Sequence, residues 1–563
     1  MGFVRRSVTI ATAITAACAM ILSLTACTAS HDDDADGGTK TTITSDSMGA
    51  AALFTPSDGI TLNQQTPLNK WAKLTPELTD ALVQYGFKKE NISHATSDTL
   101  DKQSRAIQDY VVNRLSGKTV TDDSGIAIPA ENTTVLVAPV VAADDSTRQY
   151  GDYVSQELST ESDADEGATD SDDATSDQPA DGSSNGQSSS STNSNDESNH
   201  STDDSDDSTD TGDDDTQAQA VERLVSSLKL AQESGMHVVL LANSIEGYKP
   251  DAFVSFSDAR TIGHLQAQNM AAKLELDKAS KDNPKRIEVL LPYTTSDDGD
   301  TGTGIDSQFA KEAFRGIWQV LGAYYQKGTV VSPSGALTKN TTEDDWLNVA
   351  YDIGKDRATA KVLSMRLEHS GSTSTTTRID GIIAMNDYVA SEVVAKLDDL
   401  GYTGSAADIN PQITISGIVG NITGKKDLAR ESVPDPVKAP ENDDSANDTG
   451  SDAANETDKG KDSQWPLVTG YGSYISSIPN VVKGKQWMTG IENRQLLAAD
   501  IAEVCGRLNT GKPLSDMSSV RDTTVGGIKK VPTLNEPPLA VSASNLKATL
   551  IDPGYISLAD AGL

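Results

Sequence analysis

Uninterrupted hydrophobic runs alternate with amphipathic stretches along most of this chain. Residues 133–141 (TTVLVAPVV) and 236–242 (MHVVLLA) are largely apolar, which is typical of strands buried on both faces of a parallel sheet. Residues 101–117 instead place Ile107 and Val111 at helical spacing. We therefore predict an α/β fold in which parallel strands alternate with helices that cover the sheet.

The second half of the chain continues this alternation. Its hydrophobic runs predict strands at 286–294, 328–332, 380–386 and 465–470. Its amphipathic stretches predict helices at 306–325, 344–369, 388–402 and 493–511, followed by a hairpin at 523–534. These are too many strands for one open sheet of this size, so we predict two Rossmann-like lobes.

Charge is distributed very unevenly along the sequence. The chain has 46 Lys and Arg against 83 Asp and Glu, a net charge of −37, and 19 of the acidic residues lie between Glu161 and Asp215 with no Lys or Arg among them. Neither flank of this stretch holds a complete sheet, so we interpret about 155–217 as a disordered insert within one lobe. A second insert with acidic stretches is predicted at about 431–464. Because a long acidic chain repels phosphate backbones, we expect no nucleic-acid partner.

The N-terminus has the pattern of an export signal. Arg5 and Arg6 precede an apolar stretch at 8–22, and residues 24–27 (LTAC) resemble a bacterial lipobox. We predict that residues 1–26 are removed and that Cys27 carries a lipid, with 27–48 as a flexible tether. The protein is then expected at the cell membrane, lipid-anchored on the extracytoplasmic face. The alternative is a plain signal peptide with a chance cysteine.

Few residues in the chain point to catalysis or to a metal. Only Cys505 would remain as a free thiol after processing and lipidation, and its helical surroundings predict a buried core cysteine. The acidic loop at 297–306 lacks the Gly and Glu that a calcium loop requires, so we interpret it as solvated. No histidine pair has metal-binding spacing, and no nucleophile–base arrangement is apparent. We therefore expect no cofactor, no metal and no enzymatic activity.

Five stretches in the same order as in a known family carry a resemblance. They are 69–87 (NKWAKLTPELTDALVQYGF), 234–274 (from SGMHVVLLAN to AAKL), 380–402 (DGIIAMNDYVASEVVAKLDDLGY), 465–498 (from WPLVTGYGSY to NRQLLA) and 531–556 (from VPTLNEPP to DPGYI). Together they resemble the type I periplasmic-binding-protein family, specifically the sugar-binding proteins of ABC transporters that bind multiple sugars or xylose.

The resemblance implies two Rossmann-like lobes with parallel sheets, joined by a hinge of three segments, with a sugar held between them. It places an N-terminal lobe at 49–257, continued at 489–538. It places a C-terminal lobe at 258–488, and the hinge with the C-terminal tail at 539–563. In open α/β sheets ligands lie beyond the carboxyl ends of the strands, and hinge closure buries them.

Three candidate ligand-binding residues come from the first half of the chain. Trp71 resembles the family's sugar-stacking Trp, and packing into the lobe core is the alternative. Lys70 occupies the position of the family's Arg. Asp258 takes the place of a hinge aspartate, although an Asp at a helix start often serves only as an N-cap.

The remaining candidates lie in the second half. Asn386 is expected to face the cleft, while Asp387 would cap the next helix. Gln486, Trp487 and Glu492 fall near the second crossing, where Glu492 is close to a hinge contact of the family and a solvated surface position is the alternative. Tyr471 and Gly472 stand where the family's strand continues into Gln-Asp, so the aspartate that binds two sugar hydroxyls is replaced.

These residues predict a function in solute capture. We expect an extracytoplasmic lipoprotein that binds a sugar or sugar-like molecule between its lobes and delivers it to an ABC transporter permease. The alternative is a sensory or regulatory protein, or a degenerate binding protein that no longer binds free sugar tightly.

Overall fold

The computed structural model describes most of the chain from residue 48 onward. The described ranges are 48–57, 67–116, 128–141, 145–159, 213–294, 305–354, 357–368, 376–406 and 464–563. The predicted signal peptide, the lipidation at Cys27, most of the tether, most of both acidic inserts and nearly all of the loop at 297–306 lie outside these ranges.

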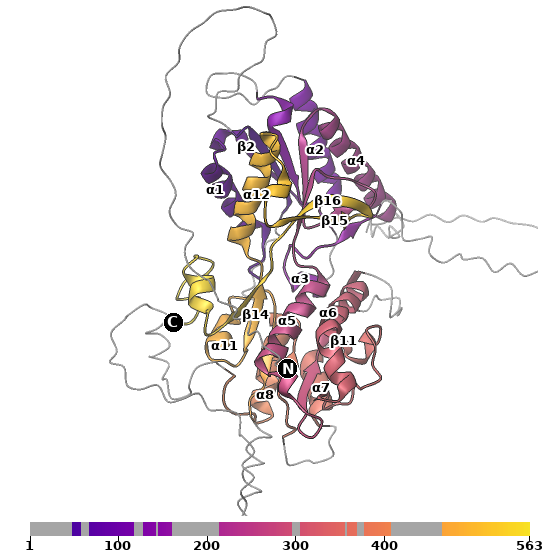
Figure 1. The fold of residues 1–563 in the computed structure, drawn as a ribbon, viewed down its shortest axis with the longest axis vertical. Coiled ribbons are helices and arrows are strands. Elements are labelled where there is room, and N and C mark those ends of the chain that lie inside the picture. The colour runs from indigo at the N-terminus through magenta and orange to yellow at the C-terminus, as the bar shows by residue number, and fades with distance from the viewer. Residues whose placement is uncertain are drawn as a thin grey trace, which may run out of the picture. The chain divides into compact units, whose positions relative to one another are not determined.

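Strands and helices alternate through the described residues (Figure 1). The strands are β1 (Ala50–Pro56), β2 (Ile92–Ser97), β3 (Thr133–Val137), β4 (Glu157–Leu158), β5 (His237–Leu241), β6 (Ser244–Ile245), β7 (Ala252–Ser255), β8 (Lys285–Val289), β9 (Leu291–Tyr293), β10 (Val330–Val331), β11 (Ala350–Asp352), β12 (Gly381–Ile383), β13 (Leu467–Thr469), β14 (Met488–Ile491), β15 (Val520–Val525), β16 (Ile528–Asn535) and β17 (Leu539–Ser542). The helices are α1 (Trp71–Tyr85), α2 (Leu100–Leu115), α3 (Asp145–Arg148), α4 (Asp213–Glu233), α5 (Ala259–Lys273), α6 (Ile305–Lys327), α7 (Ala358–Glu368), α8 (Asp387–Asp399), α11 (Ile478–Val482) and α12 (Arg494–Asn509).

The larger sheet has seven strands in the order β15-β16-β7-β5-β3-β1-β2, all parallel except for the antiparallel hairpin of β15 and β16. Alternate residues of β1 face opposite sides, as the two-residue period of a strand requires. Ala51 and Leu53 pack in one core with residues of α1 and α12, whereas Ala52 and Phe54 pack in another with residues of α2 and α4. We call this sheet with its four helices the large-sheet lobe.

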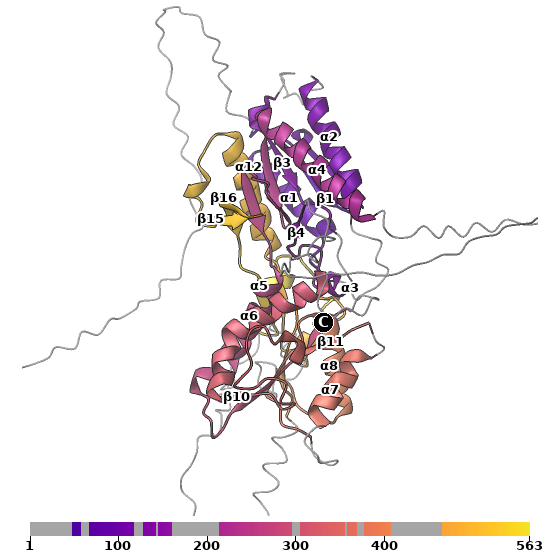
Figure 2. The ribbon, with the colours of Figure 1, turned by 90° about the vertical axis from the view of Figure 1, so that its right-hand side faces the viewer.

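The smaller sheet has four parallel strands in the order β10-β8-β12-β13. Its strands contribute to one hydrophobic core together with α5, α6, α7 and α8, and Figure 2 shows α7 and α8 side by side. After Leu290 the path of β8 continues as β9, which pairs with β11. We call this assembly the small-sheet lobe.

Three segments of the chain cross between the two lobes. The first is 256–258, which leads from β7 to α5, and the second follows β14 into α12. The third leads from β16 to β17, which pairs antiparallel with β14. The predicted α/β fold, with two lobes of parallel strands and three connecting segments, is therefore confirmed, as is the hairpin at 523–534.

One expectation about local structure was wrong. The stretch 344–369 does not form one helix, because residues 350–352 form strand β11 beside β9 and α7 begins only at Ala358. An Asx turn interrupts the stretch, in which the Gly354 N–H donates to Asp352 Oδ1 (2.9 Å). The predicted first insert at about 155–217 overlaps described elements at both ends, since β4 pairs with β6 on one side and α4 begins at Asp213 on the other.

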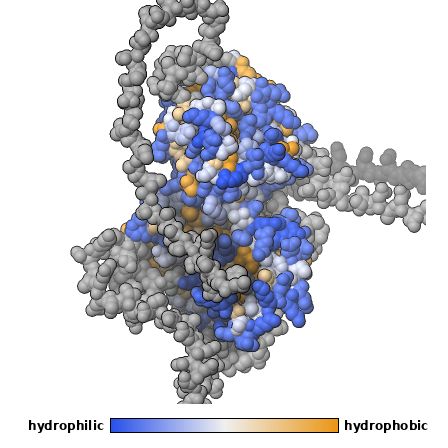
Figure 3. Space-filling view, viewed as in Figure 1, coloured by the Kyte–Doolittle hydropathy of each residue, from blue (hydrophilic) through white to orange (hydrophobic). Residues whose placement is uncertain are grey.

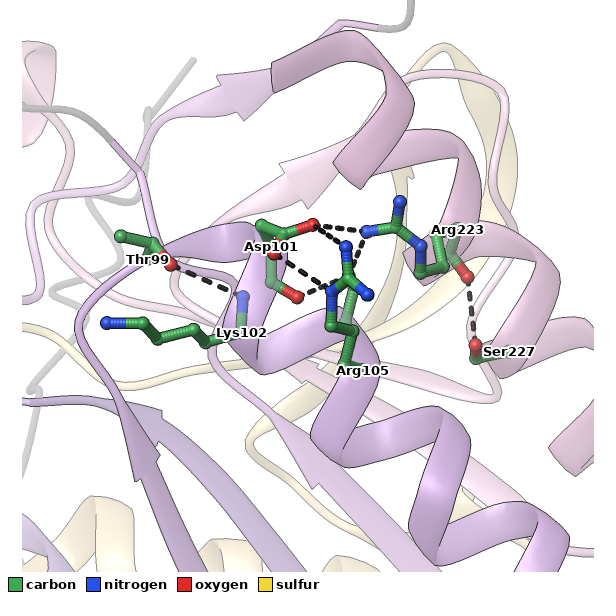
Figure 4. Close-up of polar contacts among 7 residues, drawn as sticks. Thr99, Asp101, Lys102, Arg105, Arg223 and Ser227 are labelled. Atoms are coloured by element: carbon green, nitrogen blue, oxygen red, sulfur yellow. Dashed lines mark hydrogen bonds and ion pairs between the residues drawn. The ribbon is translucent and has the colours of Figure 1, made fainter. Parts of the chain in front are cut away.

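Helices α2 and α4 pack against each other and are joined by charged groups (Figure 4). The Asp101 carboxylate accepts hydrogen bonds from Arg105 on its own helix (3.0 Å) and from Arg223 on α4 (2.5 Å). These hydrogen bonds lower the pKa of Asp101. Thr99 caps the start of α2 by accepting from the Lys102 N–H.

Two further features of the described residues are the polarity of their surface and the environment of Cys505. Most side chains on the face drawn in Figure 3 are hydrophilic. Within the described part of the chain, no helix combines the length and apolar character needed to cross a membrane. Cys505 is fully buried in α12, as predicted, and burial raises the pKa of its thiol.

Close packing of α5 against α6 generates a first prediction. A Cβ added to Gly316 would lie 2.0 Å from the Arg260 carbonyl oxygen on α5, a backbone atom that cannot move aside alone. We expect Gly316→Ala to force the two helices apart and to lower the free energy of unfolding by about 1–3 kcal/mol, the usual range for overpacking. Urea unfolding followed by circular dichroism measures this. Gln319→Ala on the exposed side of α6 serves as the control and should change stability by less than about 0.5 kcal/mol.

Candidate functional site

Polar side chains collect where strands of both lobes end and the crossings begin. Asn386 follows β12, Tyr471 follows β13, Glu492 follows β14 and Ser257 follows β7. All four residues are buried. Because the ligand sites of open α/β sheets lie beyond the carboxyl ends of parallel strands, this region is the candidate site.

The first part of the site is centred on the Glu492 carboxylate, which is only 1% exposed. Glu492 Oε1 accepts hydrogen bonds from the Tyr471 hydroxyl and from the Ser257 backbone N–H, both at 2.9 Å. Asn69, just before α1, donates from Nδ2 to the Tyr471 hydroxyl (3.4 Å) and accepts from the Glu492 N–H (3.3 Å). Burial raises the pKa of Glu492 and the pKa of Tyr471. The predicted hinge contact is therefore internal to the protein, and the solvated alternative for Glu492 does not apply.

The second part is centred on Asp387, whose carboxylate is fully buried. Asp387 Oδ1 accepts from Gln486 Nε2 (2.7 Å), and Oδ2 accepts from the Tyr474 N–H and from the Thr489 hydroxyl (both 2.9 Å). Burial raises the pKa of Asp387 to about 6, although these hydrogen bonds oppose the shift. Gly470 has to be a glycine here, because a Cβ at this position would lie 2.2 Å from Asp387 Oδ1.

The helix cap was assigned to the wrong residue. Asn386, not Asp387, is the N-cap of α8: its backbone is extended and its Oδ1 accepts from the Val389 N–H (2.9 Å). Asp387 is already helical, and its carboxylate turns toward Gln486 and Tyr474 instead. The other end of the Asn386 amide donates to Gln149 Oε1 (3.0 Å), so this side chain does point between the lobes.

The three candidates from the first half all have partners within the protein. Trp71 is 2% exposed and packs edge-on against Tyr153 (4.9 Å between ring centroids) and Phe256 (5.9 Å), as the core alternative predicts. Lys70 forms an ion pair with Asp152 (2.9 Å). Asp258 is exposed and caps α5 by accepting from the Thr261 N–H (2.7 Å), as the N-cap alternative predicts. None of these contacts tests whether the residues bind a ligand.

Sequence reasoning missed the segment that lies closest to these candidates. Residues 149–154 (QYGDYV) precede the acidic insert and contact Asn386, Lys70 and Trp71. Two buried tyrosines within six residues, next to a stretch almost free of aromatic residues, are a compositional signal that could have drawn attention to this segment. The expected boundary of the insert at about 155 obscured it.

A cavity of about 290 Å³ opens at the carboxyl ends of β1 and β2. Its lining consists of Thr55, Pro56, Trp71, Ala72, Thr75, Pro76, His94 and Thr96. The Trp71 indole N–H is buried and has no hydrogen-bond partner among the described residues. His94 Nε2 lies 2.9 Å from the Thr55 hydroxyl, and burial lowers the pKa of His94, which favours the neutral imidazole. Hydroxyl and imidazole groups thus form part of the lining of this cavity.

Comparison with known proteins finds no matching family model and no matching curated protein. Among solved structures, a carbohydrate-transporter solute-binding protein from Chloroflexus aurantiacus in complex with D-glucose is similar, with 15% identity, 91% of this chain and 97% of that chain covered, and a TM-score of 0.42. An ABC transporter solute-binding protein from Clostridium phytofermentans with bound β-D-glucose has 15% identity, coverages of 91% and 99%, and a TM-score of 0.42. An arabinose-binding protein from Geobacillus stearothermophilus has 9% identity, coverages of 89% and 99%, and a TM-score of 0.40. Within the described residues, no group of three or more His, Cys, Asp or Glu side chains could hold a metal ion.

The buried Asp387 carboxyl predicts a pH-dependent stability. Its pKa of about 6 in the folded protein exceeds the value near 4 expected after unfolding, so the folded state binds the proton more tightly. The contribution of this group to stability is therefore present below about pH 4 and is lost as the pH rises to 6. We expect the stability of the wild type relative to Asp387→Asn to fall by about 2 kcal/mol between pH 4 and pH 7.

Urea unfolding of both proteins at intervals between pH 4 and pH 7 measures this difference. Asp345→Asn is the control, because hydrogen bonds from Thr342 lower the pKa of Asp345. The difference in stability between the wild type and this variant should therefore stay nearly constant above pH 4. If the difference in stability between the wild type and Asp387→Asn also stays constant with pH, the raised pKa of Asp387 is contradicted.

The Tyr471 hydroxyl generates a separate prediction. Tyr471→Phe removes the side-chain donor to Glu492 Oε1 and leaves a buried carboxylate with one fewer hydrogen bond. We expect the free energy of unfolding to fall by about 1–3 kcal/mol, the cost of an unsatisfied buried group. Tyr324→Phe removes a hydroxyl that donates to Asp277 at the surface of α6 and should cost less than about 0.5 kcal/mol. Equal losses of unfolding free energy in the two variants would contradict this prediction, because the buried hydroxyl would then stabilise the protein no more than a surface hydroxyl does.

Proposed function

We propose that this protein is an extracytoplasmic solute-binding protein that captures a sugar between its two lobes for an ABC importer. The observation that carries the proposal is the convergence of strand ends from two parallel sheets on one buried polar region, with three crossings that allow the lobes to separate. Hinge closure around a ligand is a general use of such an arrangement. The sugars bound by the similar solved structures agree with this proposal.

The side chains at the strand ends suit a ligand rich in hydroxyl groups. Sugars need planar polar groups that pair with each hydroxyl and an aromatic face for their C–H groups. Asn386, Asp387 and Gln486 supply amide and carboxylate groups on the small-sheet lobe, and Lys70, Trp71 and Asp258 lie at the edge of the large-sheet lobe. Tyr471 and Glu492 would contribute between them.

The cavity beside Trp71 is a natural place for the first contact with a sugar. Its volume of about 290 Å³ lies at the lower end of the range for small-molecule sites. Thr75 and Thr96 would provide hydroxyl partners on either side.

The proposal also includes a location at the cell membrane and a permease as partner. A lipid on Cys27 would hold the protein on the extracytoplasmic face of the cell membrane, beside the permease that receives the solute. Binding of a sugar followed by transfer to a permease requires no catalytic group, and we propose no enzymatic activity and no nucleic-acid partner.

A second candidate function is favoured by one observation. Most of the candidate ligand residues bond to each other or to residues 149–153. A degenerate binding protein, or a sensory one that signals through its two-lobed body, would be expected to have candidate residues that bond to one another in this way. In that case no free sugar binds tightly.

A thermal-shift screen of the full-length protein in detergent against pentoses, hexoses and short oligosaccharides separates the two. Under the proposed function one sugar raises the melting temperature by mass action. Thr75→Val and Thr96→Val, which each remove one hydroxyl from the cavity, should then weaken that sugar's affinity by about 3- to 10-fold. Thr79→Val, one turn further along α1 and outside the cavity, is the matched control. If no sugar shifts the melting temperature, the second candidate replaces the first.

A further inference from the structure

The segment that follows β3 leaves the large-sheet lobe and enters the core of the other lobe. Helix α3 lies against α6 and β9 of the small-sheet lobe, and Figure 1 shows it next to α6. Tyr150 and Val154 belong to the hydrophobic core of the small-sheet lobe, where the Tyr150 ring packs on Phe309 (4.6 Å between centroids). Tyr153, between them in sequence, belongs instead to the core of the large-sheet lobe. The segment therefore contributes side chains alternately to both lobes.

Polar contacts attach this segment to the strand ends of the small-sheet lobe. The Asn386 amide donates to the Gln149 side chain (3.0 Å), and the Tyr474 hydroxyl donates to the Gln149 carbonyl oxygen (2.6 Å). Both partners lie next to the buried Asp387, whose carboxylate accepts from the Tyr474 N–H. Gln149 thus takes the place at which a ligand group would meet Asn386.

A second set of contacts attaches the segment to the start of α1 on the large-sheet lobe. The Asp152 carboxylate pairs with the Lys70 ammonium (2.9 Å) and accepts from the Trp71 N–H (3.3 Å). The Asp152 N–H donates to the Asn69 carbonyl oxygen (2.8 Å). Gly151 has a φ of +119°, and a Cβ there would lie only 2.5 Å from the Asn69 Cβ. A glycine is required at 151 for this close approach.

We propose that residues 149–154 act as an internal occupant of the inter-lobe site and hold the two lobes closed without a bound solute. Hereafter they are called the inter-lobe segment. The segment contacts Lys70, Trp71 and Asn386, which are groups that a solute would otherwise use. Because the segment is part of the chain, its contacts form at a high effective concentration, and modest individual interactions suffice to keep the site occupied. Any solute that enters between the lobes has to displace this segment.

Hydrogen exchange of the full-length protein, in the absence of any sugar, tests the proposal. Two reporting amides are Leu68 N–H, which crosses between the lobes to the Gly472 carbonyl oxygen (2.8 Å), and Asp152 N–H. Gly151→Ala pushes the segment away from Asn69. Tyr474→Phe removes only the hydroxyl that donates to the Gln149 carbonyl oxygen.

Two matched control variants make the same chemical changes, Gly to Ala and Tyr to Phe, at positions that do not contact the inter-lobe segment. Gly328→Ala places the same side chain at a glycine of positive φ (+72°) with nothing within 4 Å. Tyr324→Phe removes a surface hydroxyl on α6. In both controls, exchange at Leu68 and Asp152 should match the wild type.

We expect exchange of both amides to become about tenfold faster in Gly151→Ala and in Tyr474→Phe, while β3 and β5 stay protected. Unchanged exchange at Leu68 in both variants would overturn the proposal, because the segment would then not hold the lobes together. If Gly151→Ala also exposes β3 and β5, the variant has unfolded and Tyr474→Phe decides alone.

The result does not depend on sugar binding, so the two proposals can fail separately. Faster exchange at Leu68 in a protein that binds no sugar would support the inter-lobe segment and reject solute capture. Under both proposals, Tyr474→Phe binds the sugar found in the thermal-shift screen more tightly than the wild type, since less of the segment has to be displaced. Sugar binding with unchanged exchange at Leu68 would support solute capture alone.

Discussion

The hydrogen-bonded carboxylate of Glu492 is the interaction on which the arrangement of the lobes depends. A carboxylate buried in a protein interior is costly unless other groups pair with it. The groups that pair with Glu492 come from separate parts of the chain: Ser257 from the first crossing, Tyr471 from the end of β13 and, through its own N–H, Asn69 before α1. The hydrogen bonds of this one residue therefore join two crossings, a strand end and a helix start.

The aromatic residues around this network determine what the space between the strand ends can accept. Tyr150 packs between Phe309 and Tyr471, and Tyr153 packs against Trp71 and Phe256. In a sugar-binding cleft such rings face the ligand, whereas here they face one another. Under the two proposals, the same side chains would serve a solute only when the lobes separate and residues 149–154 withdraw. Solute capture and a self-occupied interior would then be two states of one site, and the balance between them would set the affinity for a ligand.

Much of the fold could be predicted from local patterns because each strand has to be hydrophobic on the faces it buries. The run at 133–141 and the hairpin around Gly526 and Gly527 follow directly from this requirement and from the left-handed backbone of the turn. The stretch 344–369 was misjudged because its strand has only three residues, and pairing with β9 outweighs its helical pattern. The assignment of the cap to Asp387 failed for a similar reason. Both Asn and Asp can cap a helix, and only the distant Gln486 and Thr489 decide that Asp387 turns inward.

The sequence by itself determined the α/β class, the parallel strands, the two lobes and most of the positions where candidate residues would lie. These properties depend on the period of hydrophobic residues, which is a local property of the chain. Only the tertiary structure decided what those residues touch. Lys70 meets Asp152, and Asn386 meets Gln149, 237 positions away. Such pairings have no local signature, because they are set by how burial and hydrogen bonding are satisfied across the whole molecule. The contacts of residues 149–154 with both lobes could therefore emerge only from the folded protein.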